Sequence, residues 1–399
     1  MLDVLYLAHD VADPAIRRRT LMLEAGGANV TVAGFRRGAD TPLTGGVLEL
    51  GVTSDGLFGQ RIAAVGKAAM ALGAKLRGVR KPGIIMARNL EMLALANRAN
   101  AIFGGEVPIV YECLDIHRLL LRQDIAGRAL RAAEHYLGRN VSLLITSSPA
   151  FIDNYFRPLS RLKAPVMLLE NQVIDLEDSA AMQTARPRSP QPGAPWKIGW
   201  FGALRCRKSL KLLSDFTRTM DGTFEVVLRG RPAYSEFDDF DGLVENEPFM
   251  RFHGAYKNPE DLARIYDDVQ FSWGIDFFEE GLNSSWLLPN RLYEGCRYNA
   301  VPIAMQGTET ARFIHAKNIG LVLERADSAA LADLFSGMTR ERYFAEFGKV
   351  AATGTSTWVF DRADCQRLVN RLAALRASDA HAAPIPELSQ THSNKGGLL

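Results

Sequence analysis

The chain has 399 residues, of which 47% are hydrophobic and 23% charged, and its formal net charge is +2. This length predicts at least two domains, and the small net charge argues against a nucleic-acid-binding protein. The four cysteines lie far apart and form no Cys-x-x-Cys pair, so we expect neither a zinc site nor a disulfide framework, which fits a reducing cytoplasm. We also expect no membrane span and no signal peptide, because no apolar run is long enough and residues 1–7 lack a basic region.

The first 170 residues alternate short apolar runs with helical patterns. This alternation predicts β–α units and a doubly wound parallel sheet. The predicted strands are 3–8, 29–35, 47–52, 83–87, 107–111, 141–146 and 167–169. The pair Gly26-Gly27 ends the first predicted helix and does not open it, so it is not a dinucleotide-binding fingerprint.

The loop after the strand at 107–111 holds Glu112, Asp115 and His117 close together in sequence. Three titratable side chains at one strand end can supply a general base or hold a sugar hydroxyl. A metal site is disfavoured, because no other cluster in the sequence has ligand spacing.

Residues 61–80 predict an amphipathic helix whose charged residues are all basic. Such a helix can lie on an anionic membrane face. It can also pack on the sheet and leave its basic edge in solvent. Packing is favoured, because the apolar side is rich in Ala and weakly hydrophobic.

The composition changes at 175–195, where Ser, Pro, Gln and Arg dominate, which predicts a linker or a flexible surface loop. Strand and helix patterns then resume and predict a second Rossmann-like domain. Its predicted strands are 196–201, 224–229, 250–254, 269–274, 301–304 and 320–323. A terminal helix is predicted over 363–375, and the aperiodic tail from Ser378 is expected to be disordered.

The first strand of the second domain leads into a glycine turn at Gly202, followed by Arg205, Arg207 and Lys208 and then by a helix over 210–220. Backbone N–H groups at a helix N-terminus and nearby cations favour an anion. A solvated basic turn is the alternative. A phosphate site is favoured, because strand, glycine and cations occur in the order that such a site needs.

Glu294 lies in a helix that is predicted to begin at Pro289 and to end at Asn299 in a left-handed conformation. Leu292 and Cys296 form the apolar face of this helix. A solvated carboxylate is the ordinary interpretation of a lone helical Glu. A ligand-binding carboxylate is the alternative, because open α/β sheets bind ligands near the ends of their strands.

Two Rossmann-like halves, a linker and a C-terminal helix resemble the GT-B glycosyltransferases. The run Ile198–Gly202 with Lys208 resembles the turn that opens the donor domain of glycosyltransferase family 4. Residues 289–294, followed by Val301-Pro302-Ile303, resemble the Glu-containing donor segment of that family. The stretches that resemble the acceptor half of bacterial exopolysaccharide glycosyltransferases, including succinoglycan-type enzymes, are 3–7, 13–18, 87–89 and 111–117.

The resemblance covers about residues 1–375 and implies an α/β GT-B fold, with two Rossmann-like doubly wound domains facing a central cleft. It implies an acceptor-binding domain over 1–174 and a nucleotide-sugar-binding domain over 196–355. The linker is 175–195, a C-terminal helix over 356–377 can pack back on the N-terminal domain, and 378–399 is the disordered tail.

By the same resemblance, the donor is a nucleotide-diphosphate sugar, expected to be a UDP-sugar, and the acceptor is a glycan or polyprenyl-linked oligosaccharide. The site is cytoplasmic, with peripheral contact to the inner membrane. No metal and no cofactor are implied, because GT-B enzymes stabilise the diphosphate with cations and a helix N-terminus.

The site residues follow from this resemblance. Glu294 would accept hydrogen bonds from the ribose hydroxyls, and Asp115 or His117 would be the catalytic base if the enzyme inverts. The other expected donor-binding residues are Gly202, Arg205, Lys208, Asn290 and Arg291. The expected acceptor-binding residues are His9, Asp10, Arg17 and Asn89.

The sequence departs from the family at Trp286, where a second Glu is common. Retention and inversion of the anomeric configuration therefore both stay open. Two other functions fit the same fold, a GT-B-type nucleotide-sugar epimerase and a non-catalytic scaffold of a polysaccharide-assembly complex.

Overall fold

The computed structural model describes residues 1–37, 46–53, 58–177 and 187–378. Residues 178–186 of the predicted linker, residues 379–399 of the predicted tail and the stretches 38–45 and 54–57 therefore lie outside the described residues. The chain forms two compact units. The first comprises Met1–Ser147, Ile152–Leu169 and the helix that begins at Arg362, and the second comprises Ser148–Phe151 and Glu170–Asp361.

The first unit contains a fully parallel seven-stranded sheet in the order β3-β2-β1-β4-β5-β6-β7. Its strands are β1 Leu2–Ala8, β2 Ala28–Arg37, β3 Leu48–Thr53, β4 Ile84–Arg88, β5 Ile109–Glu112, β6 Val141–Thr146 and β7 Val166–Leu168. The central strands are buried along nearly their whole length, as expected of a sheet covered on both faces. The doubly wound parallel sheet predicted for this half is confirmed.

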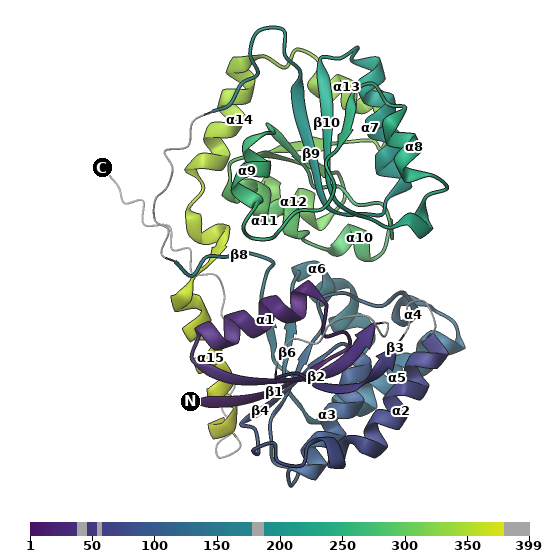
Figure 1. The fold of residues 1–399 in the computed structure, drawn as a ribbon, viewed down its shortest axis with the longest axis vertical. Helices are drawn as coiled ribbons and strands as arrows, with labels where there is room; N and C mark the ends of the chain where they lie inside the picture. Colours follow the sequence, from purple (N-terminus) through teal and green to yellow (C-terminus); the bar gives the residue numbers. More distant parts are fainter. Residues whose placement is uncertain (38–45, 54–57, 178–186, 379–399) are drawn as a thin grey trace. The chain divides into compact units, whose positions relative to one another are not determined.

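Helices cover both faces of this sheet (Figure 1). They are α1 Pro14–Ala25, α2 Phe58–Lys75, α3 Leu90–Ile102, α4 Arg118–Leu121, α5 Ile125–Leu137 and α15 Arg362–Ser378, with a 3-10 turn Gly138–Asn140 and a π-helix Ile152–Ser160. Asp13 caps α1 by accepting a hydrogen bond from the Ala15 N–H. α15 packs against α1. Gly26 allows this contact, because a Cβ there would lie 2.3 Å from the Cys365 carbonyl oxygen.

The second unit contains a parallel six-stranded sheet in the order β11-β10-β9-β12-β13-β14. Its strands are β9 Trp196–Leu204, β10 Phe224–Pro232, β11 Met250–Phe252, β12 Phe271–Trp273, β13 Val301–Met305 and β14 Leu321–Leu323. A separate pair joins β8 Val173–Ile174 to β15 Val359–Phe360. Consecutive residues of β9 enter two different cores, because Trp200 packs in one hydrophobic cluster and Phe201 in the other.

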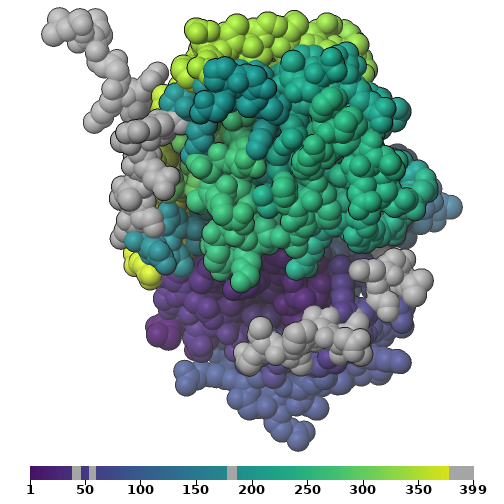
Figure 2. Space-filling view, turned by 45° about the horizontal axis from the view of Figure 1, so that its top comes forward, coloured from purple at the N-terminus to yellow at the C-terminus, as the bar shows by residue number. Residues whose placement is uncertain are grey.

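The helices of the second unit are α6 Pro149–Phe151, α7 Arg207–Thr219, α8 Phe240–Glu245, α9 Leu262–Asp267, α10 Asn283–Trp286, α11 Asn290–Arg297, α12 Glu309–Ala316, α13 Ser328–Phe335 and α14 Arg340–Ala352, with 3-10 turns Tyr234–Glu236 and Thr355–Thr357. The segment from α13 to α14, yellow-green in Figure 2, forms part of the outer surface of this unit. Asn299 adopts a left-handed φ of 63° just after α11, as predicted. The second Rossmann-like sheet is also confirmed.

Candidate functional site

The sheet of the second unit reverses its strand order between β9 and β12, which are neighbours although β10 and β11 separate them in sequence. Parallel α/β sheets bind ligands beyond the carboxyl ends of the strands at such a switch point. Arg205 and Lys208 follow β9, and Asp276 and Glu280 follow β12. The fold therefore brings two polar segments together at this point.

The turn after β9 is held by close backbone packing. Gly202 and Gly230 lie opposite each other on β9 and β10, with φ angles of 111° and 134°. A Cβ on Gly230 would lie 1.8 Å from the Gly202 carbonyl oxygen, so no other residue fits there without a backbone shift. The Cys206 side chain then caps α7 by accepting a hydrogen bond from the Ser209 N–H at 3.3 Å.

The two predicted phosphate-binding cations point to carboxylates of the second polar segment. Arg205 Nη2 lies 3.1 Å from Asp276 Oδ2, and Lys208 Nζ lies 2.7 Å from Glu280 Oε2. Arg207 turns elsewhere, toward Asp238 at 3.0 Å. The side chains of Arg205 and Lys208 thus diverge from that of Arg207.

Arg205 and Lys208 line a hollow of about 370 Å³ in the surface of the second unit. The Arg205 guanidinium lies 4.7 Å from the ring centroid of Phe278, and Lys208 Nζ lies 4.4 Å from that of Phe277. The hollow is lined by Arg205, Cys206, Arg207, Lys208, Ser235, Glu236, Phe277 and Phe278. Cations and the N-terminal turn of a helix at one hollow suit an anion such as a diphosphate.

Arg291, in the first turn of α11, joins this group through Asp276. Burial raises the pKa of Asp276, but Arg291 and Arg205 outweigh burial and hold that pKa below its usual value. Arg291 Nη2 donates to the Ile275 carbonyl at 2.8 Å. Its Nε is buried and has no hydrogen-bond partner among the described residues. Asn290, just before it, is exposed.

Glu294 is buried, with 6% of its surface exposed, and is not the solvated carboxylate of the ordinary interpretation. Asn258 Nδ2 donates to Glu294 Oε1 at 2.7 Å, and the Tyr266 hydroxyl donates to Oε2 at 3.4 Å. Burial, and next the Glu294 charge, raise the pKa of the nearby Tyr256 hydroxyl. Glu294 is thus a buried carboxylate on the same helix as Arg291. Its hydrogen-bond donors Asn258 and Tyr266 are neutral.

Sequence reasoning missed several residues of this site. Asp276 and Glu280 were visible only as part of a polar loop, and their pairing with cations about 70 positions earlier needs the strand order. Asn258 and Tyr266 carry no sequence signal that links them to Glu294. The hollow does not include Glu294 in its lining.

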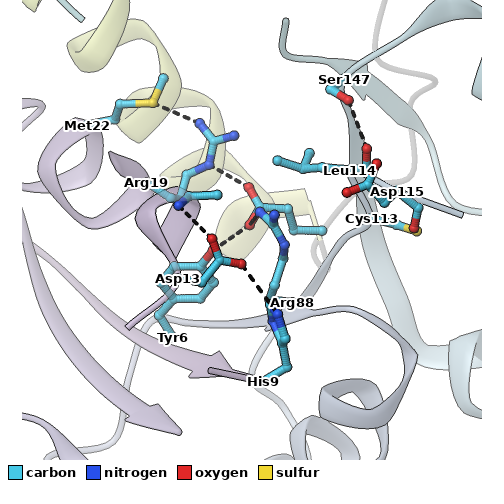
Figure 3. Close-up of polar contacts among 12 residues, drawn as sticks. Tyr6, His9, Asp13, Arg19, Met22, Arg88, Cys113, Leu114, Asp115 and Ser147 are labelled. Carbon is cyan, nitrogen blue, oxygen red and sulfur yellow. Dashed lines mark hydrogen bonds and ion pairs between the residues drawn. The ribbon is translucent and has the colours of Figure 1, made fainter. Parts of the chain in front are cut away.

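The first unit has its own switch point between β1 and β4, and a buried polar cluster lies there (Figure 3). Glu112, at the end of β5, is wholly buried. It accepts hydrogen bonds from Arg19 Nε at 2.5 Å, from Arg88 Nη1 at 3.0 Å and from the Tyr6 hydroxyl. Burial would raise the pKa of Glu112, but Arg19, Arg88 and Tyr6 together lower it to about 2.

His9 lies beside this cluster, at the end of β1. Its Nε2 is 3.3 Å from Asp13 Oδ2, and its Nδ1 is buried without a hydrogen-bond partner among the described residues. Burial lowers the pKa of His9 to about 4, against the opposing effect of Asp13, so the ring is neutral near pH 7. Asp10 accepts a hydrogen bond from the Ala12 N–H and pairs with Arg37 at 3.3 Å.

The other two residues expected to bind the acceptor are Arg17 and Asn89. Arg17 is exposed on α1, whereas Arg19 points into the buried cluster. The signal for Arg19 was its helical spacing from the buried residues Ile16 and Leu23, which puts it on the apolar face of α1. Asn89 takes a φ of 70° at the start of α3, and its N–H donates to the Glu112 carbonyl at 2.9 Å.

The expected cluster of Glu112, Asp115 and His117 is not observed. Glu112 is wholly buried, whereas Asp115 and His117 are exposed. Figure 3 shows Asp115 apart from His9 and Arg88. His117 Nδ1 accepts a hydrogen bond from the Leu119 N–H at 3.3 Å and so caps α4. Buried and exposed side chains alternate in this loop, since Cys113 and Ile116 are buried while Asp115 and His117 are exposed.

All four cysteines are buried free thiols. Within the described part of the chain, no three His, Cys, Asp or Glu side chains are grouped so that they could hold a metal ion. None of the described helices is both long and apolar enough to cross a membrane.

Comparisons with known proteins place this geometry in a family. No family model matches the chain. The chain is 61% identical over 404 residues to the succinoglycan biosynthesis protein ExoL of Rhizobium meliloti (strain 1021), and the match covers the whole of both chains.

Solved structures share the fold at low identity. HepE of Anabaena, solved with UDP and glucose, matches with a TM-score of 0.64 and 16% identity, over 94% of this chain and all of that one. The lipopolysaccharide outer core galactosyltransferase WaaB matches with a TM-score of 0.61 and 13% identity, over 93% of this chain and 99% of that one. The chain therefore belongs to the family of the succinoglycan biosynthesis protein ExoL, glycosyltransferases with the GT-B fold.

Proposed function

We propose that this glycosyltransferase takes a hexosyl group from a UDP-sugar and transfers it to a polyprenyl-linked oligosaccharide during succinoglycan assembly. The acceptor is presented at the cytoplasmic face of the inner membrane, where the protein makes peripheral contact. The observation that carries the proposal is the hollow of the second unit, which combines Arg205, Lys208 and the start of α7. HepE, which shares the fold, has been solved with UDP-glucose.

Two groups of residues in the donor site bind different parts of the nucleotide. Arg205 and Lys208 neutralise the diphosphate, and Arg291, which acts on Asp276 together with Arg205, adds a third positive charge nearby. Gly202 lets the backbone approach the ligand closely. Glu294 accepts hydrogen bonds from the ribose hydroxyls, in addition to those that Asn258 and Tyr266 donate to it. Asn290 lies exposed at the start of the same helix.

The same cations serve the chemistry as well as binding. Cleavage of the bond between the sugar and the diphosphate leaves negative charge on the leaving phosphate. Fixed cations and N–H dipoles stabilise this developing charge in the transition state more strongly than they stabilise the bound donor. This difference lowers the activation barrier. The site needs no metal and no cofactor for this step.

In the first unit, His9, Asp10, Arg17 and Asn89 bind the acceptor. The neutral His9 ring suits a hydroxyl group, because its Nδ1 can accept a hydrogen bond. If the reaction inverts the anomeric configuration, Asp115 or His117 takes the proton of the attacking hydroxyl, since both are exposed. Glu112 does not take this role, because it is buried in ion pairs with Arg19 and Arg88.

A thermal-shift panel of UDP-, GDP- and ADP-sugars tests the donor. A ligand that binds only the folded state raises the melting temperature, and we expect the largest rise with a UDP-sugar. Lys208→Ala and Glu294→Ala should each reduce that rise. An equal response to all three nucleotides, or unchanged binding in both variants, would reject the proposed donor site.

A further inference from the structure

Three helices of the first unit form one continuous outer layer. α2 packs against α3, and α3 packs against α5, on the same side of the seven-stranded sheet (Figure 1). α3 also contacts β1, β4 and β5, so its inner side is covered by the sheet. The outer sides of α2, α3 and α5 together make a broad surface, called the α2–α3–α5 face below.

From Gln60 onward, where the structure describes its side chains, α2 buries only a narrow stripe. The buried side chains there are those of Ala68 and Leu72, and Leu76 continues the stripe just past the end of the helix. Met70 lies about half a turn from Ala68 and is 79% exposed, and Ile62 is 54% exposed. The helix thus packs on the protein along one side and presents apolar side chains on the other.

α5 repeats this arrangement. Ile125 is 75% exposed at its start, and Tyr136 is 63% exposed near its end. The Arg139 guanidinium lies 4.0 Å from the ring centroid of Tyr136. A tyrosine and an arginine together suit a boundary between water and an apolar phase, because each joins an apolar body to a polar tip.

Cations outnumber carboxylates among the exposed charges of the α2–α3–α5 face. The exposed cations of these helices and their ends are Lys67, Lys75, Arg77, Arg98, Arg128 and Arg139. Only two carboxylates occur within the three helices. Glu134 is wholly buried, and Glu91 is half-buried in an ion pair with Arg61. At the helix ends, the exposed Asp124 caps α5 and is paired with Arg122, so the six cations remain in excess.

We propose that the α2–α3–α5 face docks on a bilayer that contains anionic lipids. Met70 and Ile125 enter the headgroup boundary, and the surrounding cations neutralise lipid phosphates. This arrangement uses both features of the face, since an anionic surface attracts the cations and the apolar boundary shields the exposed side chains. The proposal specifies the membrane contact of the proposed function, but it does not require glycosyl transfer.

Co-sedimentation of the full chain with lipid vesicles tests the proposal. We expect binding to phosphatidylcholine–phosphatidylglycerol vesicles, little binding to phosphatidylcholine alone, and loss of binding as salt is raised. The variant Lys67→Glu/Arg128→Glu should lower the vesicle partition at least tenfold, since each cation near an anionic surface contributes about fivefold. Met70→Ser/Ile125→Ser should weaken the binding that remains at higher salt.

The matched control is Lys211→Glu/Lys349→Glu, which makes the same change in net charge at exposed positions of the second unit. It should bind vesicles nearly as the wild type does. Equal losses in both charge variants, or no sedimentation of the wild type with anionic vesicles, would overturn the proposal. The thermal shift with UDP-glucose, measured on each variant, reports folding and donor binding separately, so failure of the donor site is distinguishable from failure of the docking surface.

Discussion

Lys208 Nζ lies 2.7 Å from Glu280 Oε2, in an ion pair whose side chains are 44% and 54% exposed. An exposed pair of this kind contributes about 0–1 kcal/mol to stability, because water screens it and two long side chains must be ordered. The pair therefore costs little to break. In the proposed donor complex, the diphosphate replaces this carboxylate as the partner of the Lys208 ammonium.

This relationship gives opposite predictions for the two partners. Lys208→Ala should weaken UDP-sugar binding about tenfold, because one charge-assisted contact to the diphosphate is lost. Glu280→Gln should strengthen binding by a few-fold, because the competing carboxylate charge is removed. Isothermal titration of UDP-glucose measures both. Lys211→Ala, one turn further along α7, is the control and should leave affinity unchanged. Weaker binding in Glu280→Gln would show that Glu280 itself contacts the donor.

Glu294 can be tested through the ribose. If its carboxylate accepts hydrogen bonds from the ribose hydroxyls, the wild type should bind UDP at least tenfold more tightly than 2′,3′-dideoxy-UDP. Glu294→Ala should bind the two nucleotides about equally. The readout is the ratio of two dissociation constants, so a general loss of stability does not mimic it. A ratio unchanged in the variant would place the ribose elsewhere.

The sequence predicted both sheets, the helix that carries Glu294 and the glycine turn before α7, because each rests on local patterns of apolar residues and turn residues. It did not predict the buried cluster around Glu112. Arg19, Arg88 and Tyr6 come from three separate elements, and only the strand order brings them together. It also grouped Asp115 and His117 with Glu112, because closeness in sequence does not reveal that Glu112 is buried while Asp115 and His117 are exposed.

Glu112 should be a major stabilising residue of the first unit. Glu112→Gln leaves Arg19 and Arg88 buried without their carboxylate, and removal of one side of a buried ion pair costs about 3–5 kcal/mol. Urea unfolding measures this loss. Glu49→Gln, which breaks the more exposed pair with Arg36, is the control and should cost less than about 1 kcal/mol. Similar losses in the two variants would contradict the special role of the buried cluster.

His9 predicts a pH dependence of stability with a defined window. Burial lowers its pKa to about 4 in the folded chain from the ordinary value of 6.5, although Asp13 opposes this shift and Arg88, Arg37 and Arg61 support it. The unfolded chain therefore binds the proton first as the pH falls. Stability is fully present above about pH 6.5 and falls between pH 6.5 and 4, by on the order of 3 kcal/mol.

Urea unfolding across this range, with His9→Asn as the comparison, isolates the effect of His9. The variant should lose stability less steeply than the wild type between pH 6.5 and 4. The contribution of Glu112 lies in a lower window, from its ordinary value of 4.5 to about 2, because its folded pKa is lowered. Identical profiles for wild type and His9→Asn would show that the imidazole is not desolvated in the folded chain.

Gly230 should tolerate no side chain. Gly230→Ala places a Cβ 1.8 Å from the Gly202 carbonyl oxygen at a φ of 134°, so β9 and β10 must move apart at the donor turn. The expected cost exceeds about 3 kcal/mol, because both steric overlap and an unfavourable backbone conformation contribute. Gly254→Ala is the control: its φ is 74°, but no atom lies within 4 Å of the added Cβ, so only the backbone cost of about 1 kcal/mol remains. Thermal unfolding of the two variants therefore separates backbone strain from the close approach of the strands, and a similar drop in melting temperature for both would mean that β9 and β10 can shift without cost.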